Sequence, residues 1–345
     1  NSQQPTANTQ HPTANTQHPT AITQQPTPNS QHPTPRIVFM GTPELAAHCL
    51  ASMLNAGHHV AGVITAPDRP AGRGRKISHS PVKALAVERG LPLLQPDNLK
   101  SPAFLDELNA LKPELQVVVA FRMLPEVVWS LPPLGTFNMH ASLLPDYRGA
   151  APINWVLING ERRTGVTTFL LDHQIDTGKI LMQRPIPIEE GETAGTLHEK
   201  MKHHGADIIL DTIQAIASGQ ASPVSQTELI PPDALLHKAP KIYREDCRIN
   251  WDQPCQEIVN RIRGLSPQPG AFCEWEKNDC ESLYIKLFEA IPEPTAHTHP
   301  TGKMITDNKN SLSFAAADGF VHIKTLQIPG KKPMKTDELL RGYQF

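Results

Sequence analysis

The sequence predicts an α/β protein in two parts, a parallel sheet covered by helices on both faces and, after it, a small β-barrel. From Arg36 to about Ser218, short apolar segments alternate with helical segments, which is typical of a parallel sheet. In the last third of the chain, short strand-like segments follow one another with turn residues between them, which is typical of a barrel. With 345 residues, of which 39% are hydrophobic, the chain is long enough to build both cores.

The first part begins with a short apolar strand at 36–40, and a Gly-Thr-Pro turn leads into a helix with one apolar face at 44–56. The other strands expected here are 60–65, 116–120, 136–139 and 165–171, and the other helices are 81–89, 102–111 and 193–218. Sheets of this kind bind ligands at the carboxyl ends of their strands. We expect Asn138, His140 and Asp176 just beyond such ends, where a site can form.

The second part follows a segment, 219–240, that is rich in Ser, Pro, Gln and Ala and is expected to be a linker. A helix is expected at 253–265, before Pro267 and Pro269. The expected strands are 270–275, 283–290, 302–306, 311–316 and 319–327. The predicted organisation is therefore 1–35, 36–218, 219–240 and 241–345.

Residues 1–35 consist of a seven-residue repeat that carries Pro-Thr at a fixed place in each copy. The segment contains no Asp, Glu, Lys or Arg and almost no apolar side chain, so burial cannot offset the entropy of ordering it. The repeated proline and the lack of apolar a and d positions exclude a coiled coil, and no apolar centre of a secretory signal is present. We expect a disordered extension without a catalytic role.

Composition excludes several classes of protein. The formal net charge is −2, so any affinity for RNA must come from local patches. The five cysteines are odd in number and form no Cys-x-x-Cys pair, which argues against a disulfide framework and against a structural zinc site. No apolar run approaches the roughly 20 residues of a membrane span. We expect a cytoplasmic protein that does not associate with membranes.

Two segments carry the side chains of a candidate active site. The first is Asn-Met-His-Ala-Ser-Leu-Leu-Pro-Asp-Tyr-Arg-Gly-Ala-Ala-Pro at 138–152, and the second is Asp-His-Gln-Ile-Asp-Thr-Gly at 172–178. They supply an amide in Asn138, an imidazole in His140 and a carboxylate in Asp176. An amide can polarise a carbonyl, an imidazole can stabilise an oxyanion and a carboxylate can accept a proton. This set suits acyl transfer to an amine without a nucleophilic Ser or Cys.

A third segment is a basic loop with four cations among the eight residues from Arg69 to Lys76. The cations are Arg69, Arg73, Arg75 and Lys76, and two glycines lie among them. The loop is longer than the usual connection of about two to six residues between elements of such a sheet. An ordinary solvated surface loop is the alternative to a loop that contacts RNA.

The two segments of the candidate site resemble the signature of the folate-dependent formyltransferases, in which an Asn-x-His pair ends a strand and a distant Asp lies in an Asp-Thr-Gly turn. The Ser-Leu-Leu-Pro-x-Tyr-Arg-Gly-Ala-Ala-Pro variant and the basic loop are similar to the branch of this family that acts on methionyl-tRNA. In the second part, 238–242, 249–251 and 329–334 match the pattern of the same branch. The resemblance covers 36–345.

The resemblance implies a Rossmann-like catalytic domain with a mostly parallel sheet and an OB-like C-terminal domain that binds tRNA. It implies transfer of a formyl group from 10-formyltetrahydrofolate to the α-amine of initiator methionyl-tRNA, in translation initiation. Asn138 would orient and polarise the formyl oxygen, His140 would stabilise the oxyanion, and Asp176 would fix the geometry and assist proton removal. Ser142, Leu143, Leu144 and Pro145 would line the folate pocket, and Arg69, Arg73, Arg75 and Lys76 would contact the tRNA acceptor end. A monomer without a metal is expected.

Two other functions stay open at this point. The segment 151–157 is also similar to formyltransferases that act on a sugar-nucleotide amine, although the basic loop and the second part favour tRNA. A non-catalytic RNA-binding protein of the same fold is the other alternative, and the intact Asn, His and Asp argue against it. His198 and His203 are five residues apart and so miss a common helical face, and the turn at 41–43 lacks a dinucleotide-binding Gly pattern. We therefore expect neither a metal nor NAD.

Overall fold

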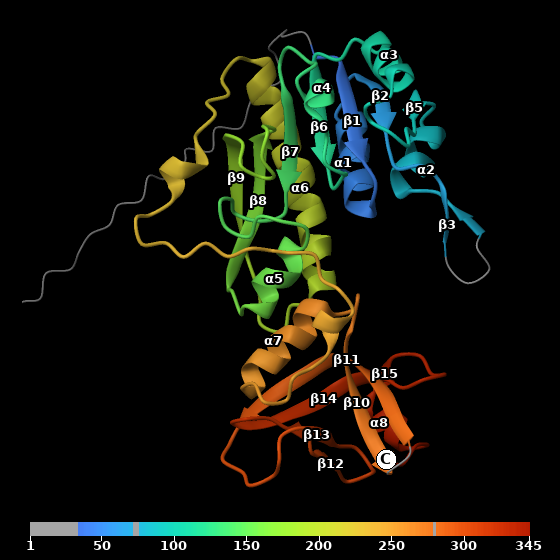
Figure 1. Ribbon diagram of the computed structural model, residues 1–345, viewed down its shortest axis with the longest axis vertical. Coiled ribbons are helices and arrows are strands. Elements are labelled where there is room, and N and C mark those ends of the chain that lie inside the picture. Colours follow the sequence, from blue (N-terminus) through green and yellow to red (C-terminus); the bar gives the residue numbers. More distant parts are fainter. Residues whose placement is uncertain (1–33, 72–75, 279–280) are drawn as a thin grey trace, which may run out of the picture. The chain divides into compact units, whose positions relative to one another are not determined.

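The structure is a computed structural model that describes residues 34–71, 76–278 and 281–345. Two β-sheets dominate it (Figure 1). The predicted disordered extension lies outside the described residues, except for its last two positions. Arg73 and Arg75 of the basic loop also lie outside them.

The first sheet has seven strands in the order β5-β2-β1-β6-β7-β8-β9. Its strands are β1 (Ile37–Gly41), β2 (Val60–Ile64), β5 (Leu93–Leu94), β6 (Leu115–Val119), β7 (Thr136–His140), β8 (Arg163–Leu170) and β9 (Ile180–Pro187). The first five strands of this order are parallel, whereas β8 runs antiparallel to both β7 and β9. The sheet is therefore mostly parallel, with an antiparallel edge.

Helices cover both faces of this sheet, as the alternation of strands and helices predicts. They are α1 (Glu44–Asn55), α2 (Pro81–Glu88), α3 (Pro102–Ala110), α4 (Glu126–Trp129), α5 (Pro152–Ile158) and α6 (Ala194–Ala217). Ile37 and Phe39 of β1 point into the core beneath α1 and α6, whereas Val38 and Met40 point into the core beneath α3 and α4. This alternation, with both faces apolar, is what a buried parallel strand requires.

The second sheet is antiparallel, with the order β10-β11-β14-β13-β12, and β15 pairs with β14. Its strands are β10 (Ala271–Asn278), β11 (Glu281–Pro294), β12 (Met304–Thr306), β13 (Leu312–Ala315), β14 (Gly319–Gln327) and β15 (Met334–Lys335). α7 (Cys255–Leu265) packs on it, and α8 (Thr336–Leu340) follows β15. The sheet curls into a half-barrel (Figure 1).

The predicted fold class, a Rossmann-like sheet followed by an OB-like part, is confirmed. α7 packs against α5, and Nδ2 of Asn154 donates a hydrogen bond of 2.8 Å to the carbonyl of Gly264. Gly264 allows this approach, because a Cβ there would lie 2.7 Å from Cγ1 of Ile158. The predicted boundaries at 218 and 240 stay a prediction.

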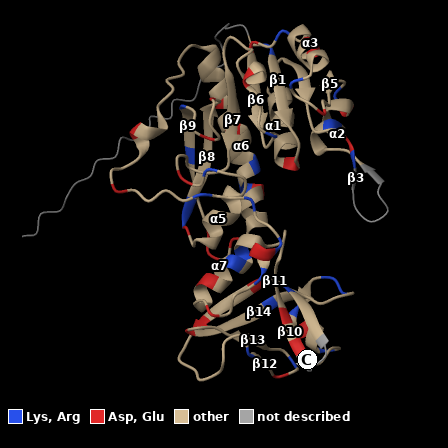
Figure 2. Ribbon diagram, in the orientation of Figure 1, with Lys and Arg blue, Asp and Glu red and all other residues tan. Residues whose placement is uncertain are grey.

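Among the described residues, no helix has the length and apolar character needed to cross a membrane. Lys and Arg alternate with Asp and Glu over both sheets and their helices (Figure 2). This mixture agrees with the near-neutral composition.

Candidate functional site

β7 presents Asn138 and His140 on the same face of the first sheet, because side chains two residues apart point to the same side of a strand. Phe137 and Met139, between and beside them, pack into the core beneath α1 and α6. Asn138 is partly buried and His140 is 7% exposed. The amide and the imidazole are thus held by a strand whose other face is fixed in the core.

The surroundings of His140 determine how its ring can act. Its Nε2 lies 2.9 Å from the carbonyl oxygen of Tyr147, so this nitrogen carries a proton and donates a hydrogen bond to that oxygen. Nδ1 lies 3.9 Å from Oδ2 of Asp176. Nδ1 is therefore the nitrogen left for chemistry, as an acceptor in the neutral ring or as a second donor in the imidazolium.

Asp176 reaches this place by a route that the sequence did not predict. We expected it just beyond a strand end at the same edge as Asn138 and His140, but β8 is antiparallel to β7. Leu170, at the end of β8, pairs with Phe137, about 10 Å along β7 from His140. The loop 171–179 must therefore fold back along the sheet, and only this return brings the carboxylate to the imidazole.

Short-range contacts give the returning loop its shape. Oδ1 of Asp172 accepts hydrogen bonds from the Gln174 nitrogen (2.9 Å) and the Thr177 hydroxyl (2.8 Å), an arrangement that favours a turn. Asp176 has a φ of +55°, in the left-handed region. Gly178 lies against the end of β8, since a Cβ there would be 1.6 Å from the carbonyl oxygen of Leu170. This close approach explains the glycine of the Asp-Thr-Gly motif.

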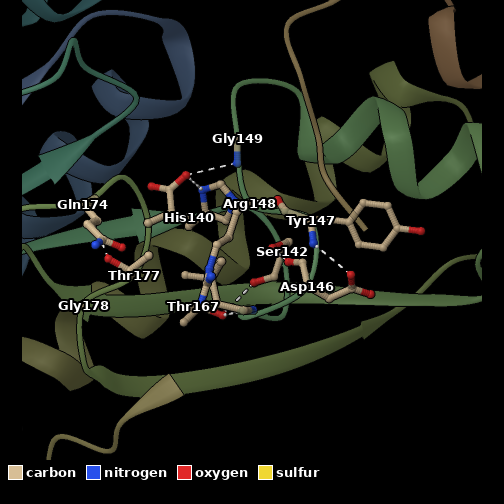
Figure 3. Close-up of polar contacts among 12 residues, drawn as sticks. His140, Ser142, Asp146, Tyr147, Arg148, Gly149, Thr167, Gln174, Thr177 and Gly178 are labelled. Carbon is tan, nitrogen blue, oxygen red and sulfur yellow. Dashed lines mark hydrogen bonds and ion pairs between the residues drawn. The ribbon is translucent and has the colours of Figure 1, made fainter. Parts of the chain in front are cut away.

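The second loop of the site, 141–151, supplies a backbone donor. The Gly149 nitrogen donates a hydrogen bond of 3.1 Å to Oδ2 of Asp176 (Figure 3). Gly149 has a φ of +128°, and a Cβ there would lie 2.4 Å from the carbonyl oxygen of Ala239. The glycine of the Tyr-Arg-Gly motif is thus required by backbone conformation and by close packing.

The four residues predicted to contact folate occupy the inner turn of this loop. Ser142 Oγ donates to the Asp146 carbonyl (2.7 Å), and Thr167 Oγ1 donates to the Ser142 carbonyl (2.6 Å). Ser142 is fully buried and Leu144 is 2% exposed. Ser142, Leu143, Leu144 and Pro145 are not among the residues that line the cavity described next. Their position indicates that they shape the loop.

A cavity of about 890 Å³ opens over Asn138, His140 and Asp176. Its walls come from the start of α1, from the loop between β6 and α4, from the start of α5 and from the loop 171–176. Among the described residues, Oδ1 of Asn138 and Nε of Arg122 are buried without a hydrogen-bond partner, and both residues line this cavity. Buried polar atoms without partners are rare, so the pair indicates a place for a polar ligand.

The loop between β6 and α4 forms an ordered apolar wall of the cavity. Arg122 holds it through a hydrogen bond of 2.9 Å from Nη1 to the Asp97 carbonyl and another to the Pro96 carbonyl. Desolvation by burial lowers the pKa of Arg122. Met123, 75% exposed, lies at the cavity. This wall was not predicted from the sequence, although its place after a parallel strand was a usable signal.

The basic loop is described only at its base. β3 (Arg69–Ala71) pairs with β4 (Lys76–Ser78), and this hairpin extends away from the first sheet beside α2 (Figure 1). Arg69 is exposed, whereas the side chain of Lys76 lies outside the described part. The Asp68 carboxylate holds the base of the loop, because it accepts a hydrogen bond from Nζ of Lys83 and another, of 3.0 Å, from Nε2 of Gln95.

The predicted linker contributes to the site, a role that was not predicted from the sequence. Gln226, 2% exposed, donates from Nε2 to the carbonyl of Asp176 at 2.9 Å. The His237 nitrogen donates to Oδ1 of Asp146, and its ring stacks on Tyr147 with the centroids 5.1 Å apart. The segment 226–240 therefore wraps the loop 141–151. Its polar composition gave no signal of this role.

Within the described residues, Cys49, Cys247, Cys255 and Cys273 are free and buried, and Cys280 lies outside them. No group of three or more His, Cys, Asp or Glu side chains in that part of the chain is arranged to hold a metal ion. His198 lines the cavity, and His203 packs edge-on against His48 with ring centroids 5.0 Å apart.

Comparisons with known proteins identify the family. Residues 35–213 match the model described as "Formyl transferase", and residues 241–344 match "Formyl transferase, C-terminal domain". A methionyl-tRNA formyltransferase of Bacteroides fragilis is 51% identical over 310 residues, which are 90% of this chain and 95% of that protein. The chain belongs to the methionyl-tRNA formyltransferase family. Membership confirms the predicted enzyme class, a formyltransferase.

Other methionyl-tRNA formyltransferases are nearly as similar. That of Flavobacterium johnsoniae is 49% identical, over 90% of this chain and 96% of that protein. The protein of Porphyromonas gingivalis is 45% identical, over 89% and 95%. The alignments include both sheets, since they extend over nearly the whole of each relative.

Two solved structures share the fold of this methionyl-tRNA formyltransferase family member. HypX from Aquifex aeolicus, solved with tetrahydrofolic acid, has a TM-score of 0.58 at 20% identity, over 89% of this chain and 47% of HypX. The chain thus spans about half the length of HypX. WlaRD, a sugar 3N-formyl transferase solved with dTDP and 5-N-formyl-THF, has a TM-score of 0.60 at 21% identity, over 87% of this chain and 99% of WlaRD.

Proposed function

We propose that the protein transfers the formyl group of 10-formyltetrahydrofolate to the α-amine of initiator methionyl-tRNA, in the cytosol and as a monomer, for translation initiation. One observation carries this proposal. Asn138, His140 and Asp176, from two segments far apart in the sequence, border one cavity in a chain half identical to methionyl-tRNA formyltransferases. The three side chains are of the types that acyl transfer to an amine requires.

The chemistry follows from the positions of these groups. The neutral α-amine attacks the formyl carbon, and the formyl oxygen becomes an oxyanion as the new C–N bond forms. The amide N–H of Asn138 and the imidazolium Nδ1–H of His140 donate to this oxygen. Each such donor is worth about 10² to 10³ in rate. The negative charge of Asp176 beside Nδ1 compensates the charge of the imidazolium.

Proton transfer completes the reaction. After the attack, the new nitrogen centre carries a positive charge and must lose a proton. Oδ2 of Asp176 is held by the Gly149 nitrogen, so its carboxylate is fixed and accepts this proton directly or through water. The bond from the formyl carbon to N10 of the folate then breaks, and N10 takes up the proton that Asp176 accepted, directly or through water, which restores the carboxylate. The products are formyl-methionyl-tRNA and tetrahydrofolate.

The cavity fits the folate co-substrate. Its volume of about 890 Å³ is within the usual range of about 300 to 1,000 Å³ for a small-molecule site. Apolar side chains of the loop from Phe121 to Leu124 and the ring of Trp129 offer a surface for a flat ring system. The unpartnered Oδ1 of Asn138 offers a polar contact at its inner end.

The basic loop is proposed to contact the tRNA acceptor end. Arg69 is exposed at the base of the β3–β4 hairpin, and Arg73, Arg75 and Lys76 belong to the same loop. Guanidinium groups pair with phosphates and with base edges. The near-neutral total charge makes such a local patch the source of RNA affinity.

A comparison of acceptors tests the proposed function. The purified protein is given 10-formyltetrahydrofolate together with charged initiator tRNA, charged elongator methionyl-tRNA or a UDP-amino sugar. We expect rapid formylation of initiator methionyl-tRNA and little of the other two. Preferred formylation of the amino sugar would overturn the proposal, and no formylation of any acceptor would favour a binding protein of the same fold.

A further inference from the structure

The side-chain amide of Gln226 lies at the centre of a closed set of contacts around the candidate site. Its Nε2 donates to the carbonyl oxygens of Asp176 (2.9 Å) and Gly178 (2.8 Å). Its Oε1 accepts from Nη2 (2.6 Å) and Nε (3.1 Å) of Arg148. Gln226 is 2% exposed, so these bonds are shielded from water. All of its hydrogen-bonding capacity serves two loops of the site.

The chemistry of these partners determines which way the amide points. Two carbonyl oxygens need a donor, and a guanidinium needs an acceptor. Turning the amide around would place its oxygen against the carbonyls of Asp176 and Gly178 and its NH₂ against Arg148. A carboxylate, an amine or an apolar side chain satisfies only part of this set, whereas glutamine satisfies all of it.

Arg148 closes the set of contacts on the other side of Asp176. It precedes Gly149, whose nitrogen donates to Oδ2 of Asp176 at 3.1 Å. Gln226 thus holds the backbone of Asp176 directly, and it holds the loop that anchors the carboxylate through Arg148 (Figure 3 shows Arg148 and Gly149). The backbone and the carboxylate of Asp176 are therefore both held in place by Gln226, which lies in the segment after α6.

Backbone conformation makes this support necessary. Asp176 has a φ of +55°, which a non-glycine residue keeps only where its surroundings impose it. The turn lies in a loop that folds back along the sheet from the end of β8, and no strand within the described residues pairs with it there. The two hydrogen bonds from Gln226 span Thr177, on both sides of the bend, and so fix the turn that aims the carboxylate.

We propose that Gln226 is a positioning residue that sets the catalytic geometry of Asp176, acting through the Asp176–Gly178 backbone and through Arg148. This inference rests on the proposed function, because it takes Asp176 as the group that assists proton removal. Displacing a catalytic group by about 1 Å can lower the rate about 10²-fold. Loss of Gln226 should therefore reduce the chemical step and leave the binding of both substrates nearly unchanged.

Two substitutions separate the contacts of the glutamine. Gln226→Met removes both kinds of hydrogen bond at similar volume. Gln226→Glu keeps an acceptor for Arg148 but turns a second oxygen toward the carbonyls of Asp176 and Gly178. We expect both variants to lower kcat about 10- to 100-fold, with the KM for tRNA and for folate within about twofold of the original.

The decisive measurement repeats these variants in an Asp176→Asn background by single-turnover formylation. A residue that acts through Asp176 loses its effect once the carboxylate is gone, so Gln226→Met should then reduce the rate by less than about twofold. An equal loss in both backgrounds, or a loss confined to KM, would overturn the inference. Arg148→Met disturbs the same carboxylate through the loop 141–151. This variant is used for the test if a Gln226 variant does not fold.

Gln116→Leu is the matched control. Gln116 is also fully buried, accepts a hydrogen bond of 2.8 Å from Thr136, and lies near the start of β6, away from the cavity. We expect the Gln116→Leu substitution to change the midpoint of thermal unfolding but not kcat. The same assay tests the proposed function separately. If the unsubstituted protein formylates methionyl-tRNA and Asp176→Asn does not reduce the rate, the proposed role of Asp176 is wrong. If Asp176→Asn is slow but Gln226→Met has a normal rate, only the proposed role of Gln226 is wrong.

Discussion

Oδ2 of Asp176 lies 3.9 Å from Nδ1 of His140, too far for a direct hydrogen bond but near enough for the two charges to interact. The His140 ring is fixed by its other nitrogen, and the carboxylate is fixed by the Gly149 nitrogen. Neither group uses its reactive atom on the other. The pair is thus arranged to act on a third group in the cavity.

Removing the proposed catalytic side chains should stop the chemistry and preserve the fold. We expect Asn138→Ala and Asp176→Ala to lower turnover by at least about 10², because each removes a group that acts on the transition state. Steady-state formylation of methionyl-tRNA measures this effect, and tRNA binding should stay nearly the same. Near-normal turnover in either purified variant would refute the assigned roles.

Gly178→Ala should be severe, although it adds a single methyl group. The new Cβ would lie 1.6 Å from the Leu170 carbonyl oxygen, so the Asp176 turn would have to move away from β8. We expect turnover to fall by about 10² or more, together with a lower midpoint of thermal unfolding. Gly219→Ala is the control for the loss of a glycine, since its Cβ would meet nothing within 4 Å, although its φ of +68° adds some strain. Equal activity of the two variants would contradict the packing argument.

The basic loop should act in tRNA recognition only. We expect Arg73→Ala to weaken productive use of initiator methionyl-tRNA by about 1–3 kcal/mol and to leave folate binding unchanged. Single-turnover formylation with saturating folate and varied tRNA, at two salt concentrations, measures this. Arg89→Ala, an exposed cation at the end of α2, serves as the control for charge. If Arg73→Ala keeps the tRNA dependence and the salt slope, the loop is an ordinary surface.

Activity should survive exhaustive chelation. The proposed chemistry uses an amide, an imidazole and a carboxylate, and none of its steps requires a metal. Mg²⁺ still helps tRNA to fold, so the assay uses tRNA folded beforehand. Inhibition that persists with this tRNA, and that only a transition metal reverses, would reveal a metal site in the protein.

Asp68 should stabilise the base of the hairpin in a pH-dependent way. Hydrogen bonds from Lys83, Gln95 and His79 hold the pKa of Asp68 well below its ordinary value of 3.8. A lowered pKa in the folded state means that the contribution is present above about pH 4 and is lost as the pH falls further. Urea unfolding of the protein and of Asp68→Asn should therefore differ at pH 7, and the difference should begin to shrink as the pH falls below about 4. A difference that does not change with pH would show that the charge has no role.

Most of the fold could be predicted, because its local signals agree with its long-range packing. The strands β1, β6 and β14 lie within two residues of their expected bounds, since apolar runs and turn residues delimit them. Ser80 and Ser101 cap α2 and α3 as their sequences suggest, each before a proline. The β3–β4 hairpin and β9 were missed. β3 and β4 have only three residues each, and β9 contains two prolines, which are unusual inside a strand.

The sequence by itself determined the fold class, the family and the chemical groups of the site, because these depend on residue types and on spacing along the chain. Only the tertiary structure decided that β8 is antiparallel, that the loop 171–179 returns to His140, and that Gln226 supports Asp176. It also placed Ser142 to Pro145 in the inner turn of the loop 141–151, and their contact with folate stays a prediction. Strand direction and contacts between distant loops arise from the packing of the whole chain, and no local pattern encodes them.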